Sequence, residues 1–256
     1  MKRIIKNIIT FASYFLPVII LVNQPALAQN KSKQISNSNM KIFVEYRLAK
    51  EGLLNDGNIN VDVNNKTITL TGTVPTLSNK HEAALEAKDV NDCYNVVNNL
   101  TLTASNVPDS VVVKKVLKKI YNNPFYGVFN WVTASDSNGV VTLAGWVSSP
   151  WNKTQFQKQA EKVVGVKEVK NIIKNTFGPG ELGFRVARLI YNDPLSMYNG
   201  MQYYSNPPIH IIVENGTVIL AGHVSSNVEI NWASNTIYFR TNAINVENYL
   251  TVNKNS

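Results

Sequence analysis

Apolar and polar residues alternate in three stretches of the chain, and a short polar turn interrupts each stretch once. In the third stretch, Ile209 and Ile211 precede the turn Asn215-Gly216, and Val218 follows it. A period of two around an Asn/Gly turn is typical of a β-hairpin with one buried face. The pattern therefore predicts three β-hairpins, at residues 59–70, 129–143 and 209–220.

Each predicted hairpin ends in the same five-residue signature, Leu-x-Gly-x-Val. The three copies start at Leu70, Leu143 and Leu220, so they lie 73 and 77 residues apart. A glycine inside a strand lets another backbone approach closely or allows a bulge, because it has no Cβ. We therefore interpret these glycines as structural residues, namely Gly72, Gly145 and Gly222.

Amphipathic helices are predicted before each hairpin, because apolar residues recur there at a spacing of three to four. The apolar positions are Ile42, Tyr46 and Ala49 in the first copy, Val112, Val113, Val116, Leu117 and Ile120 in the second, and Leu182, Val186, Leu189 and Ile190 in the third. A second helix is expected after each hairpin, most clearly where Phe156, Ala160, Val163 and Val164 recur.

A last short strand closes each copy with the sequence Val-x-Asn, at Val97–Asn99, Val169–Asn171 and Val246–Asn248. The unit thus has the order α-β-β-α-β. A hairpin, a crossover helix and a returning strand give a mixed three-stranded sheet packed on two helices. The predicted fold class is α+β, built from tandem repeats of this small module.

Repeat boundaries follow from this register. We predict modules at residues 39–104, 107–177 and 180–254, after a polar leader at residues 29–38 that is expected to be disordered. The third module carries an insertion at residues 196–208, which is rich in Tyr, Asn and Pro.

The N-terminus has the features of an export signal. A basic start at residues 2–6 precedes an apolar stretch at residues 8–22 and the sequence Ala26-Leu27-Ala28. This predicts a signal peptide at residues 1–28 that is cleaved to release a periplasmic protein. The alternative is a retained membrane anchor, although the apolar stretch of about 15 residues is shorter than the about 20 that a span needs.

Charge and cysteine content narrow the class of protein further. The whole chain has a net charge of +8, and without residues 1–28 it holds 22 basic against 17 acidic residues. This mild excess suits attraction to anionic lipid and falls short of a nucleic-acid binder. Cys93 is the only cysteine, so no intrachain disulfide can form. We expect Cys93 to be a small packed side chain; an intermolecular disulfide or a reactive thiol are the alternatives.

The α-β-β-α-β order, the Leu-x-Gly-x-Val signature and the Val-x-Asn ending together resemble the BON domain of osmotically inducible periplasmic and outer-membrane-associated bacterial proteins. The resemblance covers nearly the whole chain after residue 28, in three copies. It implies association with phospholipid in the cell envelope, protection against osmotic or envelope stress, and no enzymatic activity. The Gly-Val that usually precedes the ending is present only as Gly165-Val166.

No catalytic, metal or cofactor site is predicted from the sequence. The three histidines, His81, His210 and His223, are far apart and lack ligands at zinc-site spacing. His223 occupies the position that Thr73 and Trp146 hold in the other copies, which disfavours a role as a ligand. We therefore expect a non-catalytic protein without cofactors.

The candidate lipid-binding surface is the helix after the second hairpin. If this helix runs from about Lys153 to Val163, then Trp151, Lys158 and Lys162 share its outward stripe, with Trp146 nearby. Indole rings settle at the headgroup level of a membrane, and lysines are attracted to anionic lipid. The alternative is that Trp151 packs against a neighbouring module and the lysines form a solvated face.

The insertion supplies a candidate partner-binding surface, consisting of Tyr198, Met201, Tyr203 and Tyr204. It could enter lipid, bind an envelope protein or cap a neighbouring module. Two hypotheses of function follow. The first is a peripheral envelope protein that binds an anionic phospholipid surface and no nucleic acid. The second is a periplasmic protein-interaction or chaperone-like module.

Overall fold

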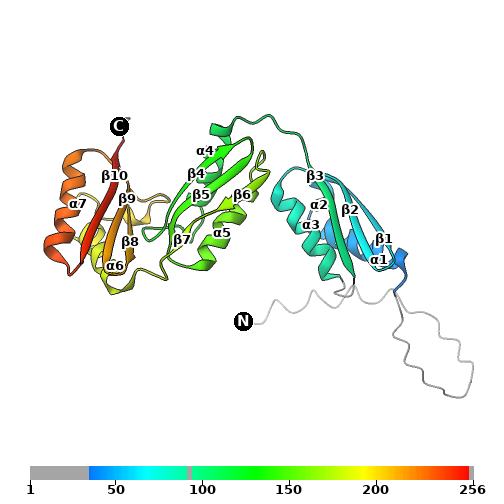
Figure 1. Ribbon diagram of the computed structural model, residues 1–256, viewed down its shortest axis with the longest axis horizontal. Coiled ribbons are helices and arrows are strands. Elements are labelled where there is room, and N and C mark those ends of the chain that lie inside the picture. The colour runs from blue at the N-terminus through cyan, green and yellow to red at the C-terminus, as the bar shows by residue number, and fades with distance from the viewer. Residues whose placement is uncertain (1–34, 91–93, 254–256) are drawn as a thin grey trace, which may run out of the picture. The chain divides into compact units, whose positions relative to one another are not determined.

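The computed structural model describes residues 35–90 and 94–253 (Figure 1). The predicted signal peptide, residues 29–34 of the leader, and Cys93 lie outside the described residues. Within them the chain forms three α/β modules, which we name module 1 (residues 37–102), module 2 (residues 109–175) and module 3 (residues 180–252). No helix in the described ranges is long and apolar enough to cross a membrane.

Module 1 has the predicted order of elements plus one extra helical turn. It consists of α1 (Asn37–Lys50), α2 (Leu53–Asp56), β1 (Asn58–Asn64), β2 (Thr67–Val74), α3 (Leu77–Asp89) and β3 (Asn95–Leu102). Strands β1 and β2 pair antiparallel, and β3 returns parallel to β2. The helix α1 starts at Asn37 because the Ser36 hydroxyl accepts a hydrogen bond from Asn39 N, so residues 37 and 38 belong to this helix and not to the leader.

Modules 2 and 3 repeat this topology. Module 2 consists of α4 (Asp109–Tyr121), β4 (Trp131–Ser137), β5 (Val140–Val147), α5 (Pro150–Glu161), β6 (Glu168–Asn171) and β7 (Lys174–Asn175). Module 3 consists of α6 (Gly180–Ala187), a π-helical turn (Arg188–Asn192), a 3-10 turn (Met201–Tyr203), β8 (Ile209–Glu214), β9 (Thr217–Val224), α7 (Asn227–Arg240) and β10 (Asn245–Val252). The predicted α+β class and the three hairpins are confirmed.

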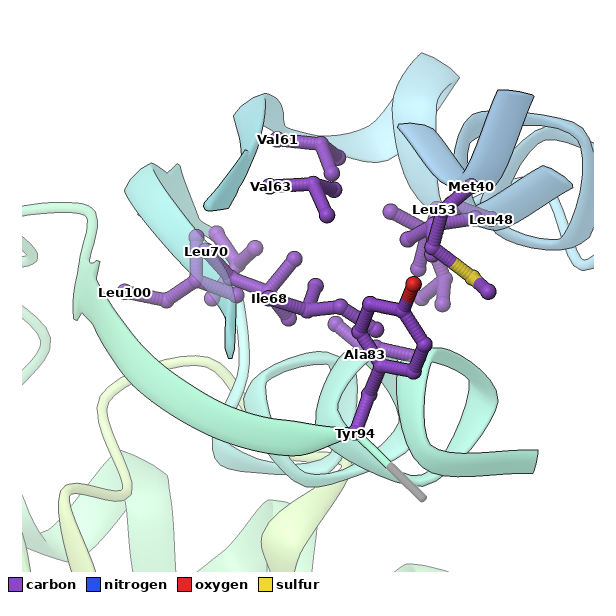
Figure 2. Close-up of a cluster of buried hydrophobic side chains, with 13 residues drawn as sticks. Met40, Leu48, Leu53, Val61, Val63, Ile68, Leu70, Ala83, Tyr94 and Leu100 are labelled. Carbon is purple, nitrogen blue, oxygen red and sulfur yellow. The ribbon is translucent and has the colours of Figure 1, made fainter. Parts of the chain in front are cut away.

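The core of module 1 lies between its sheet and its helices (Figure 2). The labelled side chains in Figure 2 are Met40, Leu48, Leu53, Val61, Val63, Ile68, Leu70, Ala83, Tyr94 and Leu100. The predicted inner face of α1 is wrong, because Ile42, Tyr46 and Ala49 are exposed. The helix instead buries Met40, Val44 and Leu48, which recur every four residues and share a core cluster with Leu53 of α2.

The signature glycines lie near the end of the second strand of each hairpin, opposite the start of the first strand. Gly72, Gly145 and Gly222 have φ values of 115°, 115° and 133°, a conformation that L side chains rarely adopt. A Cβ on any of them would overlap a backbone carbonyl oxygen at the start of the facing strand. That oxygen belongs to Asn58 for Gly72, to Trp131 for Gly145 and to Pro208 for Gly222. This close approach is the physical reason for glycine in the signature.

An asparagine in the last strand ties each sheet to its crossover helix. The side-chain amide of this asparagine donates a hydrogen bond to a backbone carbonyl oxygen of the helix. The pairs are Asn98 to Lys80, Asn171 to Lys153, and Asn248 to Ile230. In module 1 the equivalent asparagine is therefore Asn98 and not the predicted Asn99. The strand register agrees, because Asn98, Asn171 and Asn248 lie opposite the signature leucines Leu70, Leu143 and Leu220.

Candidate functional site

Trp151 lies at the start of α5, on the surface of module 2. The helix begins at Pro150 because the Ser149 hydroxyl accepts a hydrogen bond from Asn152 N at 3.2 Å. The Trp151 side chain is 48% exposed, and its ring meets that of Phe125 edge to face, with the centroids 4.4 Å apart. Phe125 is 55% exposed and belongs to the same module. The two rings form an exposed aromatic pair within module 2.

The predicted lysines occupy the same helix. Lys158 is exposed on α5, and Lys162 is exposed directly after the last helical residue, Glu161. Trp151 and Lys162 are eleven residues apart, which corresponds to about 16 Å along the axis. The stripe therefore extends over the whole length of α5, with its aromatic residue at one end and Lys162 at the other.

A groove between α4 and the end of α5 collects lysines that the sequence analysis did not select. Its volume is about 450 Å³, and Lys115, Lys118 and Lys119 of α4 line it together with Lys162 and the apolar residues Val163 and Val164. The three α4 lysines share one face because they lie three and four residues apart. No carboxylate lines this groove, and none of its lysines forms an ion pair within the described ranges.

Of the three modules, only module 2 has a net positive charge. Residues 109–175 hold ten lysines and four acidic residues, whereas module 1 holds six basic and eight acidic residues and module 3 holds three basic and five acidic residues. A net charge counted over the whole chain conceals this asymmetry. Counting charge for each repeat would have identified module 2, and the spacing of the α4 lysines would then have indicated the groove.

Trp146 does not belong to this surface. Trp146 and Trp131 pack against Ile212, Ile219 and Ala221, which lie on the outer face of the module 3 sheet. The Trp146 Nε1 atom is buried and has no hydrogen-bond partner among the described residues. The prediction that Trp146 lies beside Trp151 is wrong, because the residue after the signature glycine points to the outer face of the sheet, away from the helices.

The packing of Trp131 and Trp146 on the module 3 sheet was predictable in part from the sequence of module 3. Its strands β8 and β9 are buried on both faces, with Ile212, Ile219 and Ala221 on the outer one. At the same register positions module 1 has Asp62, Thr69 and Thr71, and module 2 has Ser135, Thr142 and Ala144. A strand that is apolar on both faces is typical of two-sided burial.

His210 is buried at the same junction of modules 2 and 3. Its Nδ1 atom lies 3.3 Å from the carbonyl oxygen of Gly127, and its Nε2 atom lies 3.2 Å from Oδ1 of Asn206. The rings of Tyr126 and Trp131 lie 5.4 and 5.0 Å from the imidazole. Burial lowers the pKa of His210 to about 4. This histidine is a neutral packing residue at neutral pH.

The insertion of module 3 is folded against its own module. Tyr198 is 5% exposed, its hydroxyl donates a hydrogen bond to Glu229, and its ring lies 5.8 Å from that of Trp232. Met201 is partly buried against the module 3 core. Tyr203 and Tyr204 are 84% and 57% exposed. Of the four predicted partner-binding residues, only these two tyrosines are therefore on the surface.

Comparison with known families identifies the repeats. The family model described as BON domain matches residues 44–104, 109–174 and 199–254. The chain belongs to the BON domain family and contains three copies of the domain. A search of curated proteins finds no match to it.

Three solved structures resemble the chain at low identity. Two come from CdsD, a structural protein of the type III secretion system of Chlamydia trachomatis. They have 12% and 14% identity and a TM-score of 0.26 each; the matches cover 83% and 85% of this chain and 91% and 98% of theirs. The third is the PrgH periplasmic domain, with 11% identity and a TM-score of 0.20, covering 80% of this chain and 100% of its own.

Proposed function

We propose that this protein is an exported, non-catalytic protein of the cell envelope that binds an anionic phospholipid surface through the helical face of module 2. This face consists of the α4–α5 groove and the aromatic pair of Phe125 and Trp151. The observation that carries the proposal is the groove itself, where four lysines gather without a carboxylate. Membership of a family whose domains bind phospholipid in envelope proteins supports it.

The energetics favour reversible, peripheral binding. Each lysine near an anionic membrane contributes about 1 kcal/mol, so the four lysines of the groove contribute about 4 kcal/mol at low salt. The exposed rings of Phe125 and Trp151 suit the interfacial region, where amphipathic aromatic side chains are favoured. Modules 1 and 3 carry net negative charge, which disfavours their approach to the same surface and orients module 2 toward it.

Vesicle flotation tests the proposal. We expect the protein to bind vesicles that contain phosphatidylglycerol much more strongly than pure phosphatidylcholine vesicles. Replacing Lys115, Lys118, Lys119 and Lys162 by Gln should weaken binding by about 100- to 1,000-fold. The matched control replaces four exposed lysines of module 1, Lys41, Lys50, Lys66 and Lys88, and removes the same charge. Equal loss in both variants, or no loss in the first, contradicts the proposal.

A second candidate function is binding of an envelope protein through the insertion. It is favoured by the exposure of Tyr203 and Tyr204 and of Leu195, which is 94% exposed. Capture of one specific protein from envelope extract that depends on both tyrosines supports this function, and capture unchanged by their replacement with Ser contradicts it. A role in osmotic or envelope-stress protection remains a prediction, which growth of a deletion strain at high osmolarity tests.

A further inference from the structure

Module 3 contains a pocket that is lined in part by its insertion. The pocket has a volume of about 360 Å³ and lies between the insertion and the start of α7. Its lining includes Met197, Tyr198, Met201 and Tyr204 from the insertion and Glu229 from α7. Pockets that hold small ligands have volumes of about 300–1,000 Å³. The insertion therefore creates a space that is large enough for a small molecule.

The pocket carries one negative charge without a counter-ion. Glu229 is the only carboxylate in its lining, and no lysine or arginine lines it or pairs with Glu229 in the described part of the chain. His223 is the one basic side chain in the lining, and its Nδ1 atom lies 2.8 Å from Oγ1 of Thr251 rather than on Glu229. Partial burial opposes ionisation of Glu229, but hydrogen bonds from Tyr198, Ser225 N and Ser226 outweigh it and hold the pKa of Glu229 below its ordinary value. The carboxylate is thus an anion at neutral pH.

Helix capping alone does not require this carboxylate. In each module a Ser or Thr caps the crossover helix and accepts a hydrogen bond from the backbone N of the residue three positions later. That later residue is Asn79 in module 1 and Asn152 in module 2, and only module 3 has Glu229. The acidic residue therefore occurs in the module whose insertion lines the pocket.

The walls of the pocket suit a cation with an apolar body. Phenol rings attract cations at their faces, and methionine thioethers are polarizable and adapt to the shape of a ligand. Tyr198, Tyr204, Met197 and Met201 supply both kinds of group. An anionic ligand would be repelled by Glu229, and a neutral apolar ligand would gain nothing from it.

We propose that this pocket binds a small organic ammonium ion, with its positive charge beside Glu229 and its alkyl groups between the tyrosine rings and the methionines. The site is independent of the lysine groove of module 2. The ammonium can come from a soluble amine or from the headgroup of a zwitterionic lipid, because both present the same chemistry.

Calorimetric titration of the full mature chain with choline tests the charge requirement, with 3,3-dimethyl-1-butanol as the neutral molecule of the same shape. We expect choline to bind and the alcohol not to bind at concentrations up to about 20 mM. Glu229→Gln keeps one acceptor oxygen for Tyr198 and Ser225 N, places an amide NH2 donor next to the Ser226 hydroxyl, and should weaken choline binding about fivefold or more. No binding of choline, equal binding of the alcohol, or full affinity in the Gln variant overturns the proposal.

A second arm distinguishes the two sources of the ligand. Flotation on pure phosphatidylcholine vesicles uses the chain in which Lys115, Lys118, Lys119 and Lys162 are replaced by Gln, so that the module 2 groove does not contribute. Flotation that depends on Glu229 assigns the ligand to a lipid headgroup. Binding of free choline without flotation assigns it to a soluble amine, and neither outcome depends on the fate of the anionic-lipid proposal.

Discussion

The rings of Phe125 and Trp151 meet edge to face with their centroids 4.4 Å apart, and both side chains are about half exposed. One ring comes from the loop after α4 and the other from the first turn of α5, so the pair joins the two helices at the surface of module 2. Exposed aromatic pairs of this kind are costly in water and favourable at a membrane interface.

Replacing Trp151 by Ala should therefore weaken binding to phosphatidylglycerol vesicles by about three- to tenfold, because the indole no longer enters the interface. Phe125→Ala should have a similar effect. Tyr238→Ala is the control, since Tyr238 is 68% exposed on module 3. Sedimentation with vesicles measures all three, and equal binding by the Trp151 and Tyr238 variants would exclude the aromatic pair from the interface.

Trp146→Ala should act on stability rather than on lipid binding. Trp146 covers part of the apolar outer face of the module 3 sheet, so its loss should lower the free energy of unfolding by about 1–3 kcal/mol. Vesicle binding should stay close to that of the unmodified chain. Urea unfolding and flotation check the two effects. A large loss of vesicle binding with unchanged stability would show instead that Trp146 contributes to lipid binding.

Acid should weaken the junction of modules 2 and 3 through His210. Its pKa is about 4 in the folded chain, below the ordinary value of 6.5, so the unfolded state takes up the proton more readily. The corresponding stability, about 3 kcal/mol, is fully present above pH 6.5, is lost progressively as the pH falls from 6.5 to 4, and is gone below pH 4. The titratable groups near the ring are Tyr126 and His223, and no carboxylate is among them.

The variant His210→Gln tests this effect, because its side chain is neutral at every pH. Between pH 7.5 and 4.5 the unmodified chain should lose about 2–3 kcal/mol more stability than the variant, measured by urea unfolding. Parallel pH dependence of the two proteins would show that the buried imidazole does not govern the junction.

Gly145→Ala should destabilise module 2 by about 2–4 kcal/mol, because the new Cβ overlaps the carbonyl oxygen of Trp131 and the backbone has a φ of 115°. Gly127→Ala is the control, since a Cβ there meets open space. Its effect should stay within about 0.5 kcal/mol. Thermal unfolding compares the two variants. If the Gly145→Ala chain is as stable as the control, the structural explanation of the signature is lost.

The features of the fold that depend on local sequence patterns were predicted correctly. The hairpins, the signature glycines and the α-β-β-α-β order follow from residues close together in the chain, and they recur three times. The face of α1 was predicted wrongly because two apolar stripes, one with Ile42 and Tyr46 and one with Val44 and Leu48, both fit helical spacing. Only the tertiary packing distinguishes them.

The parts of the site that were missed depend on contacts between distant segments. Lys162 was selected from its own helix, but Lys115 and Lys119 reach the same groove from a helix more than forty residues earlier. The contact of Trp151 with Phe125 and the contact of Trp146 with module 3 also join residues that are far apart in the sequence. A charge count for each repeat and the loss of alternation in β8 were the available local signals.

Spin-labelled lipid provides the most direct test of the central claim. Backbone amide signals of the chain from residue 29 to residue 256 are recorded with phosphatidylglycerol vesicles that carry a paramagnetic label at the headgroup. The account predicts selective broadening at Phe125, Trp151 and the lysines of the α4–α5 groove, with unaffected signals at Tyr203 of module 3 and Lys66 of module 1. Broadening centred on module 1 or module 3, with α4 and α5 unaffected, would contradict it.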